Sequence, residues 1–281
     1  IKGGPGTGKS SLMKKVSKYF NEKGYDIEQH HCSSDNNSLD GIVIKTLNVA
    51  ILDATAPHIV DPINPGAVDE VLNMGDCWDE EGFKKYRHKI IGINRKVGKT
   101  FKRAYRFFGA AKLVYDDWHN YNDEALNLNK LNILKENLKE SLFTTPASTI
   151  GYDRHLFATA FTPNGIVSYI ENLSTDYKNI YVLKGGPGTG KSDVLEFLST
   201  EALRRGHYVE IFHTPLIPEK IEHILIPDLN VAILTSNEIN NLDLPGIVID
   251  MEDCLNLSTL ENNKDEIEYD ATEFYTLLDK G

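Results

Sequence analysis

Two stretches of the sequence combine glycines, a lysine and a serine at a spacing suited to phosphate binding. Residues 3–10 read G-G-P-G-T-G-K-S, and residues 185–192 repeat the same eight letters. Both match G-x-x-x-x-G-K-[ST], the Walker A or P-loop motif, in which backbone N–H groups surround phosphate, the lysine contacts the β- and γ-phosphates and the hydroxyl binds Mg²⁺. Glycines suit such a loop because side chains would hold the N–H groups away from the phosphate. The sequence therefore predicts two nucleotide sites, with ATP and Mg²⁺ as ligands.

We call residues 3–10 loop 1 and residues 185–192 loop 2. The residues expected to bind the nucleotide lie in the two loops and directly after each of them. They are Gly3, Gly4, Gly6, Thr7, Gly8, Lys9, Ser10 and Ser11 at loop 1, and Gly185, Gly186, Gly188, Thr189, Gly190, Lys191, Ser192 and Asp193 at loop 2. Ser10 and Ser192 are also predicted metal ligands, and Lys9 is a predicted catalytic residue.

A hydrophobic run that ends in an acid completes the pattern at loop 1. Residues 47–52 read L-N-V-A-I-L and Asp53 follows, as in a Walker B strand whose carboxylate orients Mg²⁺. Asp53 is therefore a predicted metal-side and catalytic residue, and the ordinary alternative is a strand-ending Asp in a turn. Thr235 takes its place in the second copy, where Glu238 or Asp243 are the candidate substitutes. This difference predicts a more competent site at loop 1 and a degenerate or regulatory one at loop 2.

The repeat extends well beyond the loops. An offset of 182 residues between the loops also pairs Gly24 with Gly206 and His31 with His213. The run at 47–52 recurs without change at 229–234. Such internal similarity indicates a duplicated structural unit.

Strand and helix patterns alternate within each unit. A β-rich run at 179–183 precedes loop 2, a helical pattern follows each loop, and the first unit has strand patterns around 25–31, 42–45 and 48–53. This alternation predicts an α/β fold with parallel sheets, built as two tandem P-loop NTPase domains.

The predicted domains are residues 1–150, with a basic helical insertion at about 80–143, and residues 151–281. The counterpart of that insertion begins near Asp265. The sequence starts at Ile1 with no full strand before loop 1, and it stops within the second helical region, so we expect both chain ends to be truncated.

The composition excludes a membrane span. The chain has 281 residues, 41% of them hydrophobic, and a net charge of −11, with no apolar run near the roughly 20 residues that a span needs.

Cys32, Cys77 and Cys254 form no C-x-x-C pair, which favours structural roles in a reducing cytoplasm. Cysteine and histidine show no zinc-site spacing, so Mg²⁺ is the only metal expected.

Residues 84–112 form a basic segment with eleven Lys or Arg residues and no acid. Interleaved aromatic residues make it a candidate surface for nucleic acid or an acidic partner. It could also supply an arginine to the γ-phosphate, with Arg95, Arg103 and Arg106 as candidates. A solvated helix face is the ordinary alternative, and the sequence does not separate these interpretations.

Several histidines follow predicted strands, where a nucleotide would bind. His58 is the candidate γ-phosphate sensor, and His31 and His213 occupy equivalent positions. Because a lone histidine more often has a hydrogen-bonded structural role, that role is favoured and no general base is named.

The two loops, H-C-S-S-D at 31–35 and L-D-A-T-A-P-H at 52–58 together resemble uncharacterised bacterial tandem P-loop ATPase-like proteins. The resemblance implies two P-loop units with helical insertions, ATP binding through the two loops, and Asp53 as the metal-side acid. Thr235 departs from the pattern. The amino-acid sequence of the two loops also resembles that of AAA-type ATPases, at the level of fold only.

These observations predict an intramolecular pair of domains, or pseudo-dimer, that binds Mg-ATP and hydrolyses it mainly at loop 1. Two alternatives stay open. One is a kinase that phosphorylates a small molecule or nucleotide, and the other is a nucleotide-gated binding module for nucleic acid or an acidic partner.

Overall fold

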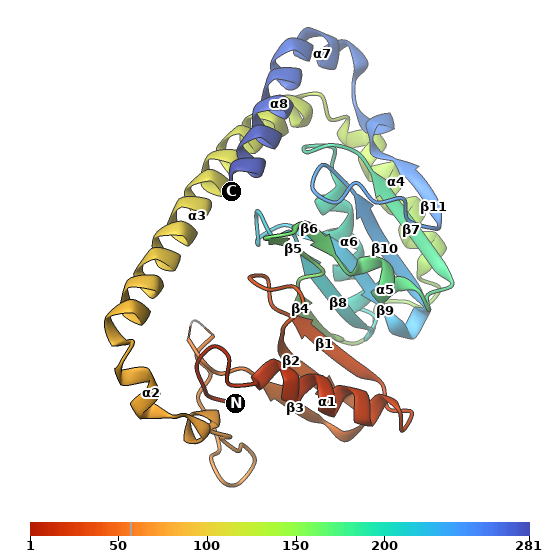
Figure 1. Ribbon diagram of the computed structural model, residues 1–281. Helices are drawn as coiled ribbons and strands as arrows, with labels where there is room; N and C mark the ends of the chain where they lie inside the picture. The colour runs from red at the N-terminus through yellow and green to blue at the C-terminus, as the bar shows by residue number, and fades with distance from the viewer. Residues whose placement is uncertain (57) are drawn as a thin grey trace. The chain divides into compact units, whose positions relative to one another are not determined.

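The computed structural model describes residues 1–56 and 58–281 and shows an α/β protein (Figure 1). The chain forms two compact units. Unit 1 contains residues 1–95 and 162–165, and unit 2 contains residues 96–161 and 166–281. The sequence repeat divides near residue 150, whereas the packing divides at 95/96, because the helices between these points pack into the core of unit 2.

Unit 1 holds a small antiparallel sheet beside one helix. Helix α1 (Lys9–Asn21) follows loop 1, and the strands β1 (Ile27–His31), β2 (Leu39–Ile44) and β3 (Val49–Leu52) pair in the order β1-β2-β3. The three predicted strands are present, but the prediction of a parallel sheet is wrong here, since both pairings are antiparallel. The connection between β1 and β2 is too short for the crossover that parallel strands need. Met13 of α1 packs on Leu39 and Ile42 of β2.

Unit 2 holds a mixed sheet of six strands in the order β11-β7-β10-β9-β8-β4. Strand β7 leads into loop 2 and pairs in parallel with β10 and β11, and β4 pairs in parallel with β8. Strand β9 runs antiparallel to both of its neighbours. The strands are β4 (Tyr152–Leu156), β7 (Asn179–Lys184), β8 (Tyr208–His213), β9 (Ile221–Ile226), β10 (Val231–Ser236) and β11 (Ile247–Asp250).

Helices cover both faces of this sheet (Figure 1). On one face, α6 (Lys191–Leu203) and α4 (Leu128–Leu142) pack on the sheet through the largest hydrophobic cluster, which includes Leu131, Leu195 and Ile224. On the other face, α5 (Ile170–Ser174) contributes Ile170 to a second cluster. A separate hairpin of β5 (Thr159–Thr162) and β6 (Gly165–Ser168) precedes α5.

The predicted helical region at about 80–143 is confirmed as three helices, α2 (Glu80–Lys84), α3 (Arg87–Glu124) and α4. After β11 come α7 (Leu257–Asn262) and α8 (Lys264–Lys280). Helix α8 lies beside the C-terminal half of α3 (Figure 1), where Tyr115 and Phe274 belong to a third hydrophobic cluster.

The two units share strand register as well as sequence. Glu28 of β1 lies opposite Val43 of β2, and the residues 182 positions later, Glu210 and Leu225, lie opposite each other in β8 and β9. The register also shifts at equivalent places, between His30 and His31 and between Phe212 and His213. An irregularity of this kind is a specific structural feature, so the duplication indicated by the sequence is also present in the backbone.

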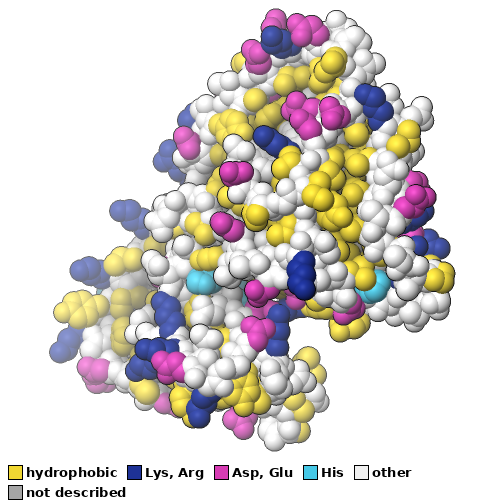
Figure 2. All heavy atoms as spheres, turned by 90° about the vertical axis from the view of Figure 1, so that its right-hand side faces the viewer, with side chains coloured by type: hydrophobic (Ala, Val, Ile, Leu, Met, Phe, Trp, Pro, Cys, Tyr) yellow, Lys and Arg dark blue, Asp and Glu magenta, His cyan; other side chains and the backbone are white. Residues whose placement is uncertain are grey.

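The sheet of unit 2 ends in an apolar edge. Ile247 and Val248 of the edge strand β11 are exposed, and Figure 2 shows hydrophobic side chains gathered on the upper part of the face it views. Among the residues that the structure describes, no helix has the length and apolar character needed to cross a bilayer.

Candidate functional site

In loop 1 the side chain of Lys9 contacts the backbone at the start of the loop. Gly8 has a φ of +89° and directly precedes α1, whose first turn has no side-chain cap. Lys9 Nζ donates to the carbonyl oxygens of Gly3 at 2.6 Å and Gly4 at 3.0 Å. The ammonium group therefore lies at the start of the loop, and no side chain caps the N–H groups at the start of α1.

Asp53 and Thr55, which follow β3, meet loop 1 in unit 1. Asp53 Oδ2 lies 3.5 Å from Lys9 Nζ, and Asp53 Oδ1 accepts a hydrogen bond from the Thr55 N–H. The Thr55 hydroxyl accepts from Gly3 N and donates to Gly3 O. The structure thus brings together the predicted residues Lys9 and Asp53 and adds Thr55, which sequence reading did not name.

Loop 2 has the same internal geometry. Gly190 has a φ of +85° and directly precedes α6, which also lacks a side-chain cap. Lys191 Nζ donates to the carbonyl oxygens of Gly185 and Gly186, as Lys9 does in loop 1. The Thr189 hydroxyl donates to Gly186 O at 2.9 Å, as Thr7 does to Gly4.

The surroundings of the two lysines differ in charge. Thr235 at the end of β10 replaces Asp53. Burial lowers the pKa of Lys191, and the negative charge of Glu238 partly opposes that shift. Glu238, one of the two candidate substitutes, therefore acts electrostatically on the loop lysine, whereas Asp243 is exposed.

Loop 2 is also covered from outside by one face of α3. Asn122 Nδ2 donates to Pro187 O at 2.6 Å, and Trp118 lies against Gly186. Gly188 has a φ of +72°, and a Cβ added there would lie 2.2 Å from the carbonyl oxygen of His119. These residues share a helix face, because Asn122 lies four positions after Trp118 and three after His119. Sequence reading missed these contacts because the packing partner is distant in the chain.

In loop 1 the equivalent positions are open. Pro5 and Gly6 are exposed, and a Cβ added at Gly6 would have no neighbour within 4 Å. Loop 1 is therefore accessible within unit 1, whereas Pro187 and Gly188 are buried in unit 2.

A buried polar cluster lies at the end of the sheet that carries loop 2. Glu222 Oε1 accepts from Asn240 Nδ2 at 2.5 Å, and His223 Nδ1 accepts from Thr235 N at 3.0 Å. Burial raises the pKa of Glu222 to about 7, although hydrogen bonds from Thr159 and Asn237 oppose the shift. Burial also lowers the pKa of His223 to about 3.

The repeat relates this cluster to unit 1. The offset of 182 pairs Asp40 with Glu222 and His58 with Asn240. His58 Nε2 lies 3.6 Å from Asp40 Oδ2, so both units place an acid beside the same partner position. Comparing the repeats beyond the loops would have found this pair, because an acid occupies the position in both copies.

The loop serines sit next to these acids. Ser10 Oγ accepts from Leu39 N at 3.0 Å, directly before Asp40. Ser192 Oγ donates to Ile221 O at 3.1 Å, directly before Glu222.

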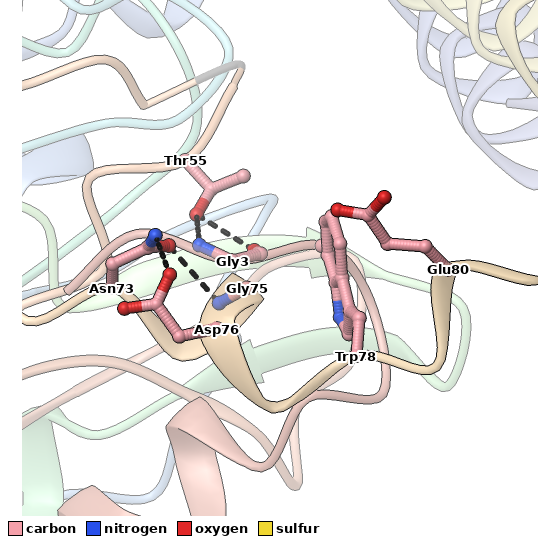
Figure 3. A pocket seen from close by; sticks show the side chains of 8 residues that line it. Gly3, Thr55, Asn73, Gly75, Asp76, Trp78 and Glu80 are labelled. Carbon is pink, nitrogen blue, oxygen red and sulfur yellow. Dashed lines mark hydrogen bonds between the residues drawn. The ribbon is translucent and has the colours of Figure 1, made fainter.

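A pocket of about 410 Å³ opens beside loop 1 in unit 1. Figure 3 shows Trp78 and Glu80 on one side of it and Thr55, Asn73 and Asp76 on the other. Gly3 and Gly4, whose carbonyl oxygens accept hydrogen bonds from Lys9 Nζ, also line the pocket, together with Gly75. The pocket therefore lies next to the end of the loop where the lysine resides.

Other predicted candidates have local partners. His31 Nδ1 contacts Asn36 O, and His213 Nε2 lies 2.7 Å from His155 Nδ1. The Arg103 guanidinium lies over the Phe107 ring and Arg106 Nε donates to Lys102 O, both within α3. The three cysteines are free, and Cys254 is buried in the core of unit 2.

The predicted magnesium ligands at loop 1, Ser10 and Asp53, are oxygen donors. Mg²⁺ prefers oxygen ligands and usually takes only one or two from a protein. Ser10 and Asp53 supply a hydroxyl and a carboxylate. No group of three or more His, Cys, Asp or Glu side chains among residues 1–56 and 58–281 could hold a metal ion by itself. Comparisons of the chain with protein-family models, with curated proteins and with solved structures find no match.

Proposed function

We propose that this protein binds ATP at two P-loops and hydrolyses it mainly at loop 1. The observation that carries the proposal is the convergence of Lys9 and Asp53, 3.5 Å apart, at an open glycine-rich loop. A lysine held by loop carbonyl groups can turn toward incoming phosphates, which the N–H groups of the following helix also attract. Asp53 then remains as an acid beside the terminal phosphate.

Magnesium would be held by Ser10 and Asp53 and would offset negative charge on the phosphate oxygens. Lys9 and Asp53 would both adjoin the bound phosphate, since Lys9 Nζ and Asp53 Oδ2 lie 3.5 Å apart. Positioning and charge stabilisation of this kind account for most catalysis of phosphoryl transfer.

Loop 2 has a different role in this proposal. It has the same lysine geometry, but Thr235 brings no charge, and α3 covers the loop. We propose that loop 2 binds nucleotide with little or no turnover and senses the bound state through its contacts with α3.

Phosphate release and nucleotide stoichiometry would test this assignment in the wild type, Lys9→Ala and Lys191→Ala. We expect Lys9→Ala to abolish turnover and leave one bound nucleotide, and Lys191→Ala to retain turnover. Lys18→Ala, at an exposed lysine on α1, controls for loss of one positive charge. Turnover that survives Lys9→Ala, or its absence from the wild type, would reject hydrolysis at loop 1.

The pocket beside loop 1 favours a second candidate, transfer of the γ-phosphoryl group to a small molecule. It adjoins the lysine end of the loop, where the terminal phosphate would lie. Asp76 and Glu80 disfavour a second anion there, so the acceptor would be neutral or cationic. Mass spectrometry of products from ATP with neutral polyols would separate a kinase, which forms a phosphorylated acceptor, from an ATPase, which releases only phosphate.

A further inference from the structure

One face of α3 carries hydrophobic residues along its length, but only half of that face is covered. In the C-terminal half, Tyr115 and Trp118 pack with Phe274 of α8. Toward the middle of the helix, where α3 enters unit 2, Val97 and Phe101 are 46% and 41% exposed. Successive steps of three or four residues place all of these side chains on the same face of the helix. We call Val97 and Phe101 the uncovered stripe.

The repeat relates this stripe to positions of α8 that pack against another helix. Helix α8 begins 177 residues after α3, and the same offset relates Met74 to Met251. Under that offset Val97 corresponds to Phe274, and Phe101 corresponds to Leu278. Phe274 is fully buried and Leu278 packs against the same cluster. The equivalent positions are thus covered in α8 and exposed in α3.

Charge indicates what could cover the stripe. Residues 84–112 carry eleven positive charges and no acid, and the whole chain has a net charge of −11, so all other residues together carry −22. Lys96 and Arg103 are seven residues apart and border the uncovered stripe. A complementary surface therefore combines apolar or aromatic groups with acids.

Helix α8 presents such a surface. Its outward side carries exposed Asp265, Glu268 and Asp279, together with exposed Tyr269 and Tyr275. The opposite side of α8 packs on α3 through Phe274 and leaves these residues accessible.

We propose that the uncovered stripe of one molecule docks on the outward side of α8 in a second copy of this chain. In a two-fold dimer the contact would form twice, since each copy contributes one stripe and one α8. Pairing two stripes directly would bring like charges together, which destabilises helix pairs. A nucleic acid would match the basic residues but leave the apolar stripe without a partner.

Sedimentation velocity over a range of protein concentrations, at low and moderate salt, tests the proposal. The expected result is a monomer–dimer equilibrium that weakens with salt, because charged pairs border the contact. Val97→Ser with Phe101→Ser should raise the dimer dissociation constant at least about tenfold, equivalent to about 1.4 kcal/mol. The thermal stability of the monomer should hardly change, because both side chains are exposed in it.

Charge reversal gives the sharper test. Lys96→Glu with Arg103→Glu should weaken the dimer, Asp265→Lys with Glu268→Lys should weaken it equally, and the four changes together should restore it. Lys14→Glu with Lys15→Glu, at exposed positions of α1, makes the same charge change elsewhere and should leave the dimer intact. A chain that stays monomeric at every concentration, or a combined variant without recovery, would overturn the proposal. A monomer that binds a short DNA duplex in place of a second copy would also overturn it and assign the basic segment to nucleic acid.

Discussion

The side-chain amide of Asn122 joins helix α3 to loop 2 through a buried hydrogen bond of 2.6 Å from Nδ2 to the carbonyl oxygen of Pro187. Asn122 lies in the long helix between the two sequence repeats, and Pro187 lies in the loop that opens the helix of the second repeat. The conformation of loop 2 therefore depends on a segment that precedes its own repeat.

Asn122→Ala should destabilise unit 2 by about 1 to 3 kcal/mol, because it leaves the buried Pro187 carbonyl without its donor. Urea unfolding followed by circular dichroism would measure the change. Asn120→Ala removes the same group from an exposed position of the same helix and should alter stability by less than about 0.5 kcal/mol. Equal effects of the two substitutions would show that the buried contact contributes nothing beyond helix propensity.

Gly6 and Gly188 occupy equivalent positions with similar backbones and different surroundings. Their φ angles are +80° and +72°, so alanine is strained at either position. Only at Gly188 would the new Cβ also meet backbone, 2.2 Å from His119 O. Gly188→Ala should therefore lower the melting temperature well below that of Gly6→Ala. Similar melting temperatures would contradict the close approach of α3 to loop 2.

Local sequence patterns predicted the parts of the fold that depend on neighbouring residues. The loops, the helices that follow them and the strand positions come from glycine spacing and hydrophobic period, and these persist in the structure. The strand directions in unit 1 were predicted wrongly. A hydrophobic run in the sequence indicates a strand, but it does not indicate whether the neighbouring strand is parallel or antiparallel to it. Only the shortness of the β1–β2 connection carried that information.

The contacts around the site were harder to predict, for a different physical reason. Asp53 follows a recognisable strand, so its proximity to Lys9 could be inferred from sequence. Asn122 acts through a partner far away in the chain, and a single sequence contains no signal for such a pair. Glu222 was detectable only by extending the repeat comparison to every acid.

Glu222 should make stability depend on pH. Burial raises its pKa from 4.5 to about 7, so the folded state binds its proton more tightly than the unfolded state. Its contribution is complete below pH 4.5 and is lost as pH rises toward 7, a loss of about 3 kcal/mol. The lowered pKa of neighbouring His223, from 6.5 to about 3, acts in the opposite direction, because its contribution is complete above pH 6.5 and is lost on acidification.

Glu222→Gln removes the first effect and leaves the second. The stability of this variant relative to the wild type should therefore grow by about 3 kcal/mol between pH 4.5 and pH 7. Urea unfolding at several pH values would measure the difference. Glu219→Gln, at an exposed position three residues earlier, provides the control. Its stability should change with pH in the same way as that of the wild type. If the stability difference between Glu222→Gln and the wild type stayed constant with pH, Glu222 would have the same pKa in the folded and unfolded states.

The two tryptophans of the chain can report separately on the two loops. A Cβ at Gly4 would lie 3.0 Å from Trp78 Cζ2, and one at the equivalent Gly186 would lie 3.7 Å from Trp118 Cζ2. Each indole thus lies beside the equivalent position of a different loop, although Trp78 lies before α2 and Trp118 lies in α3. Trp118→Phe leaves a reporter on loop 1 only, and Trp78→Phe leaves one on loop 2 only.

Addition of Mg-ADP should change the fluorescence of both single-tryptophan proteins, because phosphates entering a loop must draw its lysine away from the carbonyl groups beside the indole. Combined with these backgrounds, Lys9→Ala should remove the Trp78 response, and Lys191→Ala should remove the Trp118 response. Trp78 is 43% exposed, so an occupied pocket should also protect it from acrylamide quenching. Loss of both responses on Lys9→Ala alone would mean that loop 2 binds no nucleotide of its own, and the Trp118 signal would then report movement of α3.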